Sequence, residues 1–166
     1  PASLPNVLFG GGYSPDYVAL AQSKGYTVAT LQPDLGYLNT DLAMGLFAGG
    51  SLIPAYQDPS STQPTLDQLV RETLRLLSAS SQPFCLIVES ALIDKITVAS
   101  GIGPEVHELD LAVQEALFWR DNSSNPDATL VMVTADHETG GLVVAADGIA
   151  TFTNGAGNHT TQNVPF

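Results

Sequence analysis

An apolar run in this sequence leads directly into acidic side chains that can bind metal ions. Residues 84–88 read F-C-L-I-V, Glu89 follows at once, and Asp94 lies five residues further on. In sheets of parallel strands, ligands collect beyond the carboxyl ends of the strands. Carboxylate oxygens are ligands that suit magnesium, manganese or zinc. This segment therefore predicts a candidate site at the end of a strand.

A second apolar run ends in the same way. Residues 129–134 lead into Asp136 and His137, and a third candidate ligand, His159, lies in a later loop rich in glycine and asparagine. Carboxylate and imidazole side by side suit zinc in particular. We expect the two runs to be neighbouring strands, so that Glu89, Asp136 and His137 lie within a few ångströms of one another.

Each of these residues also has an ordinary structural interpretation. An Asp–His pair after a strand is often a polar turn in which the aspartate caps backbone amides. Glu89 and Asp94 can be a helix-capping acid and a surface acid, and His107, at the start of a helix, fits local structure better than a ligand. Spacing alone leaves both interpretations open.

Strands and helices alternate along the sequence. Strands are expected at residues 7–9, 26–30, 44–48, 84–88 and 129–134, helices at 14–24, 65–78 and 106–120, and a hairpin at 142–152 around Asp147-Gly148. The continuous apolar runs are typical of strands covered on both faces. The alternation predicts an α/β fold with a largely parallel sheet, in one domain over residues 1–166.

Composition and net charge argue against some classes of binding partner. The chain has 166 residues, of which 44% are hydrophobic, and a formal charge of −12, which argues against nucleic acid or an anionic membrane as partner. It contains no apolar stretch of the ~20 residues that span a bilayer. The single cysteine, Cys85, lies inside an apolar run and is expected to be a buried core thiol. The sequence starts at Pro1 without an initiator methionine, which is typical of processing at the amino terminus.

The string at residues 133–142, V-T-A-D-H-E-T-G-G-L, resembles the metal-binding signature of the alkaline phosphatase family. Other segments resemble the family in the same order along the chain. These are residues 7–12, 45–48, 64–66, 84–95, 158–160 and 164–165. The resemblance covers nearly the whole chain but only the second part of the family's catalytic domain. It implies a partial three-layer αβα sandwich.

The resemblance also implies roles for single residues. Glu89 falls on a magnesium ligand, Asp94 and His159 on ligands of one zinc, and Asp136 and His137 on ligands of a second zinc. Lys95 falls where some bacterial members place a lysine that reaches the phosphate through water. In the family's mechanism the zinc pair activates a serine nucleophile, and a phosphoseryl intermediate forms and is hydrolysed.

The sequence departs from the family in two respects. Four residues after Asp94 the family has a zinc-ligand histidine, and here that position is Val98, which has no lone pair. The nucleophilic serine, the phosphate-binding arginine and an early bridging aspartate belong to the family's N-terminal part, and this sequence contains no Asp-Ser dipeptide. The isolated chain is therefore expected to lack the family's reaction.

Two functional hypotheses follow. In the first hypothesis, the chain is a piece of a phosphomonoester hydrolase that a separate N-terminal chain completes. In the second, it is a non-catalytic derivative that uses the phosphatase fold to bind another molecule. The intact ligands favour the first hypothesis, and Val98 favours the second. Because missing strands would expose sheet edges, self-association or a second chain is expected. The resemblance and two possible glycosylation acceptors, Asn122 and Asn158, favour an extracellular or periplasmic location.

Overall fold

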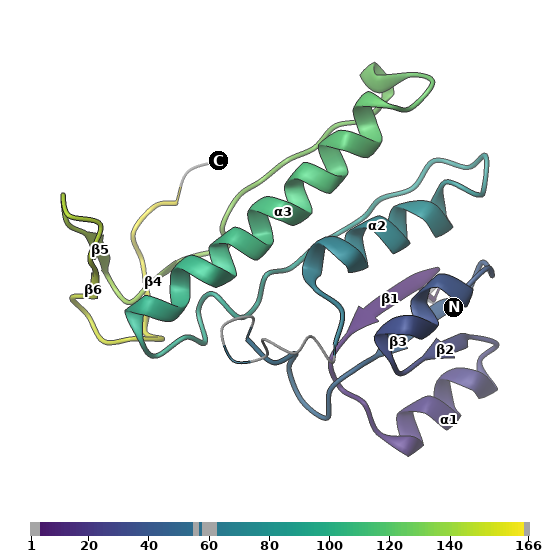
Figure 1. The fold of residues 1–166 in the computed structure, drawn as a ribbon, viewed down its shortest axis with the longest axis horizontal. Helices are drawn as coiled ribbons and strands as arrows, with labels where there is room; N and C mark the ends of the chain where they lie inside the picture. Colours follow the sequence, from purple (N-terminus) through teal and green to yellow (C-terminus); the bar gives the residue numbers. More distant parts are fainter. Residues whose placement is uncertain (1–3, 55–56, 58–62, 165–166) are drawn as a thin grey trace.

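A three-stranded parallel sheet forms one half of the molecule. The structure is a computed structural model, and it describes residues 4–54, 57 and 63–164. The strands are β1 (Val7–Gly10), β2 (Thr27–Ala29) and β3 (Ala43–Leu46), in the order β1-β3-β2. Both outer strands run parallel to β3. The predicted parallel α/β arrangement is thus confirmed for these strands, which lie between α1 and α2 in Figure 1.

The first helix has the boundaries that its sequence predicts. α1 (Pro15–Ser23) begins after Ser14, whose hydroxyl accepts a hydrogen bond from the backbone N–H of Tyr17 at 3.1 Å. Proline is tolerated in the first turn because its missing N–H would have no helical partner there. Beyond the helix, Gly25 has a φ of +90°, which turns the chain into β2.

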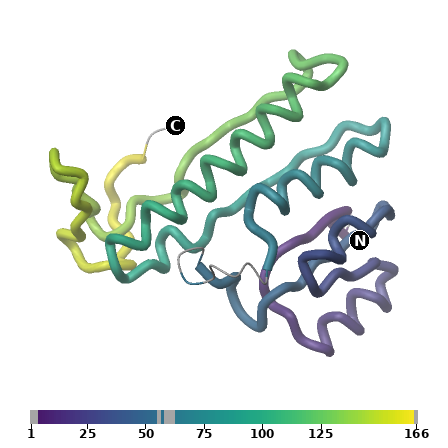
Figure 2. The backbone as a smooth tube through the Cα atoms, viewed as in Figure 1, coloured from purple at the N-terminus to yellow at the C-terminus, as the bar shows by residue number. Residues whose placement is uncertain are grey.

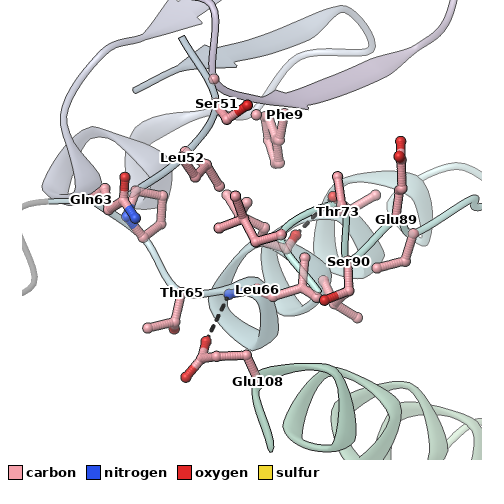
Figure 3. A pocket seen from close by; sticks show the side chains of 18 of the residues that line it. Phe9, Ser51, Leu52, Gln63, Thr65, Leu66, Thr73, Glu89, Ser90 and Glu108 are labelled. Carbon is pink, nitrogen blue, oxygen red and sulfur yellow. Dashed lines mark hydrogen bonds between the residues drawn. The ribbon is translucent and has the colours of Figure 1, made fainter. Parts of the chain in front are cut away.

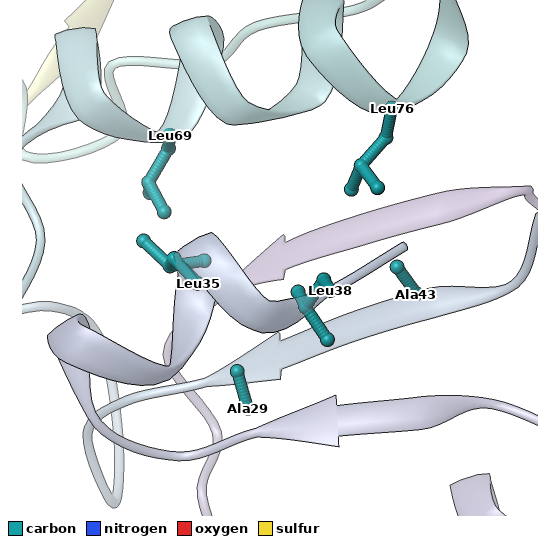
Figure 4. Close-up of a cluster of buried hydrophobic side chains, with 6 residues drawn as sticks. All are labelled: Ala29, Leu35, Leu38, Ala43, Leu69 and Leu76. Atoms are coloured by element: carbon teal, nitrogen blue, oxygen red, sulfur yellow. The ribbon is translucent and has the colours of Figure 1, made fainter. Parts of the chain in front are cut away.

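The main core lies between the sheet and α2 (Leu66–Leu77). Leu69 and Leu76 of this helix form one buried cluster with Ala29 and Ala43 of the strands, as Figure 4 shows. The 3₁₀ helix η1 (Gln32–Tyr37) and the residue after it fill the space between them with Leu35 and Leu38. The amphipathic pattern of residues 65–78 therefore correctly indicated both the helix and its buried face.

The long helix α3 (Ile102–Asp121) packs along α2 and away from the sheet, after the short 3₁₀ helix η2 (Ala99–Gly101). Val70 and Leu74 of α2 contact Ala112 of α3 in a second small core. At the surface, Arg71 Nε donates to Glu115 Oε2 at 3.1 Å, and this hydrogen bond raises the pKa of the guanidinium. Within the described ranges, no helix is long and apolar enough to cross a membrane.

The chain after α3 forms loops and short ladders. The 3₁₀ helix η3 (Pro126–Ala128) follows α3. The predicted hairpin is confirmed as β5 (Leu142–Val144) and β6 (Ala150–Phe152), with a φ of +82° at Gly148. β4 (Glu138–Thr139) pairs with β7 (His159–Thr160) in an antiparallel ladder. In Figure 2 these loops lie beside the first turns of α3, at the opposite end of the molecule from the sheet.

The two runs expected to be buried strands are not strands. Residues 84–88 and 129–134 belong to no ladder within the part of the chain that the structure describes. The Ile87 side chain is 87% exposed, Leu130 is 81% exposed, and Cys85 is exposed rather than buried. A continuous apolar run becomes a buried strand only where other strands and helices cover it. Here only one side of the first run is covered, because Leu86 packs against the second core.

Candidate metal centre

Three side chains converge between the loop at residue 94 and the β4–β7 ladder. Asp94, His137 and His159 each offer one ligand atom, and these atoms all lie within 4.8 Å of one another. Asp94 Oδ2 is 3.4 Å from His159 Nε2 and 3.9 Å from His137 Nε2. The two imidazole rings are stacked, with centroids 3.6 Å apart. Residues far apart in the sequence thus present one carboxylate and two imidazoles to one point.

Asp94 is held by a tight turn. The Ile93 N–H donates to the Ser90 carbonyl at 3.3 Å, and Ile96 just beyond is 3% exposed and anchors the loop. The second carboxylate oxygen of Asp94, Oδ1, is shielded from solvent and has no hydrogen-bond partner among the described residues. Buried oxygens of this kind are rare because each costs free energy when it is unsatisfied. A cation or a hydrogen-bond donor would satisfy it.

His137 is oriented by contacts at its other ring nitrogen. Nδ1 lies 3.0 Å from the hydroxyl of Thr139 and 3.3 Å from the carbonyl oxygen of Glu138. A carbonyl only accepts, so this contact favours the tautomer with its proton on Nδ1. The lone pair of Nε2 then faces Asp94. Metal-ligating histidines usually have their second nitrogen hydrogen-bonded in this way.

His159 is brought to the site by the β4–β7 ladder, in which it pairs with Thr139. The glycine pair Gly140-Gly141 makes this approach possible, since both have positive φ angles, +74° and +59°. A Cβ at Gly140 would lie 2.5 Å from the ring of Phe152. The Gly140 N–H also donates to the Asn158 carbonyl at 2.7 Å, next to His159.

Glu138 supports the ladder through hydrogen bonds to its carboxylate. The Thr160 hydroxyl donates to Oε2, and the Leu142 N–H donates to Oε1 at 3.2 Å. These hydrogen bonds, that of Thr160 above all, lower the pKa of Glu138 below its ordinary value. Sequence reasoning missed Glu138, Thr139 and Thr160. The first two follow the Asp–His pair directly, but nothing in the sequence links them to Thr160, 22 residues away.

The other predicted site residues lie outside this group of three. Asp136 Oδ2 is 3.4 Å from His137 Nε2, but its side chain is 89% exposed. Glu89 is exposed and lines a separate cavity, which Figure 3 shows. The segments that precede Glu89 and Asp136 are not strands, so the prediction that Glu89, Asp136 and His137 lie at the ends of two neighbouring strands is wrong. Lys95 is exposed.

Two further residues bear on the ligand set. His107 is exposed on α3 and is not a member of the group. Val98 is 50% exposed and offers no ligand atom. Asp94, His137 and His159 therefore form a set of three nitrogen and oxygen ligands, the number of protein ligands typical of catalytic zinc sites.

Known proteins with similar sequences and folds are alkaline phosphatases. The alkaline phosphatase of Escherichia coli K12 is 33% identical over 159 residues, covering 76% of this chain and 32% of that protein. The crystal structure of a cold-active alkaline phosphatase from Shewanella sp. superposes with a TM-score of 0.71 at 31% identity, over 84% of this chain and 35% of that one. A variant of the enzyme from the Antarctic bacterium TAB5, described with magnesium bound in its M3 site, has a TM-score of 0.73 at 22% identity, over 96% of this chain and 52% of that one.

The chain spans about a third of the length of the curated relatives that it matches. The family model described as Alkaline phosphatase matches residues 16–164, which is most of the sequence. The fold, a mixed α/β arrangement around a parallel sheet, agrees with that of the solved relatives. This chain belongs to the alkaline phosphatase family.

Proposed function

We propose that this chain is the metal-binding part of a phosphomonoester hydrolase and that it holds a zinc ion through Asp94, His137 and His159. The observation that carries the proposal is the convergence of His137 Nε2 and His159 Nε2 on Oδ2 of Asp94, whose other carboxylate oxygen, Oδ1, is buried without a hydrogen-bond partner among the described residues. Membership of a phosphatase family supports it. The donor set suits zinc, which prefers imidazole with carboxylate in four-coordinate sites.

Each residue of the group has a separate task. Asp94 supplies negative charge, and His137 is held in one orientation through its Nδ1. His159 lies on β7, the strand that pairs with β4, and provides the third ligand. A bound zinc would polarise a phosphoryl oxygen and stabilise the charge that develops on the leaving oxygen. Asp136, which is exposed beside His137, is our proposed ligand for a second zinc, Glu89 for magnesium, and Lys95 for contact with the phosphate.

Turnover requires a nucleophile that these residues do not include. The sequence has no Asp-Ser dipeptide, the setting in which the family carries its serine. We therefore infer that phosphomonoester hydrolysis depends on residues outside this sequence, which would supply the nucleophile. A non-catalytic binding protein derived from a phosphatase is the second candidate, and Val98 in place of a ligand favours it.

Calorimetric titration of the metal-free chain with zinc tests the proposal. We expect one zinc to bind to the unmodified chain and the affinity to fall by more than about 100-fold in His137→Ala and Asp94→Asn, because loss of an outer-shell partner alone already costs 10–100-fold. His107→Ala is the matched control and should bind like the unmodified chain. Equal zinc affinity in all variants would contradict the proposed site.

A second measurement separates the two candidates. The pure chain, loaded with zinc, should not hydrolyse an aryl phosphate. Steady hydrolysis that a chelator abolishes would show that the chain is catalytic without residues outside this sequence.

We also propose an extracellular or periplasmic location, which rests on the family and on two sequons. Asn122 lies at the end of α3, where its side chain donates to the Phe118 carbonyl at 2.8 Å. Asn158 precedes the ligand His159, so a glycan there would crowd the metal centre. Mass spectrometry of the native protein should find a glycan on Asn122 and none on Asn158.

A further inference from the structure

The loop between β6 and β7, yellow in Figure 2, contains an asparagine followed by a glycine. Asn154-Gly155 is the only Asn-Gly step in the sequence, and both residues are exposed. The backbone nitrogen that follows an asparagine can attack Cγ of its side chain and close a succinimide ring. Glycine places no side chain in the way of this attack. The step therefore has the composition of a site at which a chain modifies itself.

The reacting groups of this step have no competing hydrogen bond. Among the described residues, none accepts from the Gly155 N–H, and none pairs with the side-chain carboxamide of Asn154. The backbone of Asn154 is held instead. Its N–H donates to the Gly140 carbonyl at 2.9 Å, and its carbonyl accepts from Asn158 Nδ2 at 2.7 Å. The fold thus keeps the residue in place and leaves both the attacking nitrogen and the attacked carbon accessible.

A step of similar chemistry in the neighbouring hairpin is protected by its hydrogen bonds. Asp147-Gly148 forms the turn between β5 and β6 and could close the same ring by loss of water. Here the Gly148 N–H donates to the Ala145 carbonyl at 2.9 Å, and Asp147 Oδ1 accepts from the Ile149 N–H at 3.0 Å. Both hydrogen bonds must break before this ring closes, and each adds to the barrier. The fold therefore protects one glycine step and leaves the other open.

We propose that Asn154 is a deamidation site at which the folded chain converts itself to isoaspartate. The Gly155 nitrogen forms a bond to Cγ of Asn154, the bond from Cγ to Nδ2 breaks, and Nδ2 leaves as ammonia with the proton of the Gly155 amide. Water then opens the succinimide. Opening at the side-chain carbonyl gives aspartate, and opening at the backbone carbonyl gives isoaspartate, in which the main chain runs through the former side chain. Water is the only co-reactant, and nothing is oxidised or reduced.

The position of Asn154 gives isoaspartate a structural effect. Gly140 binds both ends of the loop, because its carbonyl accepts from the Asn154 N–H and its own N–H donates to the Asn158 carbonyl at 2.7 Å. Isoaspartate lengthens the main chain between these two hydrogen bonds by a methylene group. The longer loop does not fit the same spacing. The hydrogen bond between Gly140 and Asn158, and the adjacent pair of Thr139 with His159 in the β4–β7 ladder, should therefore loosen.

The inference goes beyond the proposed function, and it is tested by ageing the metal-free chain in mildly alkaline buffer. Peptide mapping by mass spectrometry follows the replacement of NH₂ by OH at each asparagine, and methylation by an isoaspartyl methyltransferase identifies isoaspartate. Asn158 is the internal control, because its carboxamide is hydrogen-bonded and a histidine follows it. We expect conversion at Asn154 to be at least about tenfold faster than at Asn158, a difference of about 1.4 kcal/mol in activation free energy.

Amide hydrogen exchange measures the effect on the loop. In the unmodified chain, exchange of the Gly140 amide should become faster as isoaspartate accumulates. Asn154→Gln keeps an exposed carboxamide but would have to close a larger and slower ring, so its exchange pattern should not change on ageing. Asn39→Gln, the same change at an exposed asparagine outside the loop, should age like the unmodified chain. Asn154→Asp has the normal main chain of the aspartate product and should exchange like the fresh chain.

Several outcomes would overturn the inference. Conversion at Asn154 that is no faster than at Asn158 would show that the open nitrogen of Gly155 has no effect. Conversion that occurs only after urea unfolds the chain would show that the fold protects the step. Equally fast isomerisation of Asp147 in the folded chain would show that the hydrogen bonds of its turn do not matter. Isoaspartate without faster exchange at Gly140 would contradict the structural effect.

Discussion

The two ring nitrogens of His137 face different environments, and this difference gives the residue its role. Nδ1 meets the Thr139 hydroxyl and a carbonyl oxygen, whereas Nε2 faces the carboxylate of Asp94. With a metal at Nε2 the ring would have its proton on Nδ1, where the carbonyl oxygen of Glu138 can accept it. Imidazole binds a metal only through an unprotonated nitrogen, so the carbonyl contact at Nδ1 supports the tautomer in which Nε2 can be the ligand.

Replacement of Thr139 by valine tests the contacts at Nδ1. Thr139→Val keeps the shape of the side chain but removes the hydroxyl that lies 3.0 Å from Nδ1. We expect zinc affinity to fall by about 10–100-fold, the usual effect of losing an outer-shell partner. Titration with a competing chelator measures the affinity. Thr151→Val, an exposed change in β6, is the control, and an equal fall in that variant would show that the effect is not specific to Nδ1.

Restoring a histidine at residue 98 should strengthen the site. Val98 is 50% exposed, so the packing role that a valine suggests is not its role here, and an imidazole would not be buried without partners. We expect Val98→His to fold normally and to gain zinc affinity. A gain of about 100-fold would add ~2.7 kcal/mol of stability at zinc concentrations that saturate both proteins.

The melting temperature of Val98→His with and without zinc provides the measurement. Thr97→His is the matched control, because it places the same ring one residue earlier in the same exposed loop. A Val98→His protein whose melting temperature rises with zinc no more than that of the unmodified chain would rule out a vestigial ligand position at this residue.

At the scale of elements, the β4–β7 ladder determines the centre, because it joins His159 to the segment that contains His137. The ladder has only two residue pairs, and the Glu138 carboxylate reinforces it across the strands. Its stability should therefore depend on the ionisation of Glu138, whose pKa is lowered mainly by the Thr160 hydroxyl.

The variant Thr160→Val should make this dependence visible. A carboxyl group with a lowered pKa in the folded state stabilises the fold above its unfolded pKa, about 4.3 for Glu, and loses this contribution as the pH falls through the folded value. We expect the variant to be less stable than the unmodified chain near neutral pH, with a difference that shrinks below about pH 4. Urea unfolding across this range provides the measurement, and a difference that stays constant would contradict the assignment.

Local patterns predicted some elements well and others not at all. α1, α2 and the β5–β6 hairpin follow from caps, helical periodicity and turn residues, all of which act between near neighbours. Residues 84–88 and 129–134 show strand composition, but strand pairing depends on distant partners, and none of the described residues provides one. The same limit applies to the site. The sequence identifies Asp94, His137 and His159 as candidate ligands. That these three lie together, and that Glu89 and Asp136 are not part of the group, follows from loop geometry that the sequence does not show.

At the scale of the whole molecule, the apolar surface is distributed unevenly. The main core lies between the sheet and α2, whereas residues 129–134 run along the outside with Leu130, Met132 and Val133 each more than half exposed. Contiguous apolar surface of this kind promotes association, and the charge of −12 opposes it by repulsion between molecules. Solubility should therefore fall steeply with added salt, which screens that repulsion.

Replacement of Leu130 by lysine tests this balance. Because the side chain is 81% exposed, Leu130→Lys should change the free energy of unfolding by less than about 0.5 kcal/mol. The soluble concentration in high salt should nevertheless rise, since the change interrupts the apolar run. Light scattering during a salt titration gives the measurement. Val143→Lys, at a residue 51% exposed on β5, serves as control, and an equal gain there would point to overall charge rather than to this run.

Exposure of Cys85 has a consequence for redox behaviour. Because it is the only cysteine of the chain, it has no intramolecular partner, and oxidation can join it only to a thiol of another molecule. Cys85 immediately precedes residues 86–92, which line the cavity in Figure 3, so a disulfide there would tether a second molecule at its entrance. In an oxidising compartment the thiol–disulfide potential, and not only non-covalent affinity, would then set the fraction of chains held in pairs.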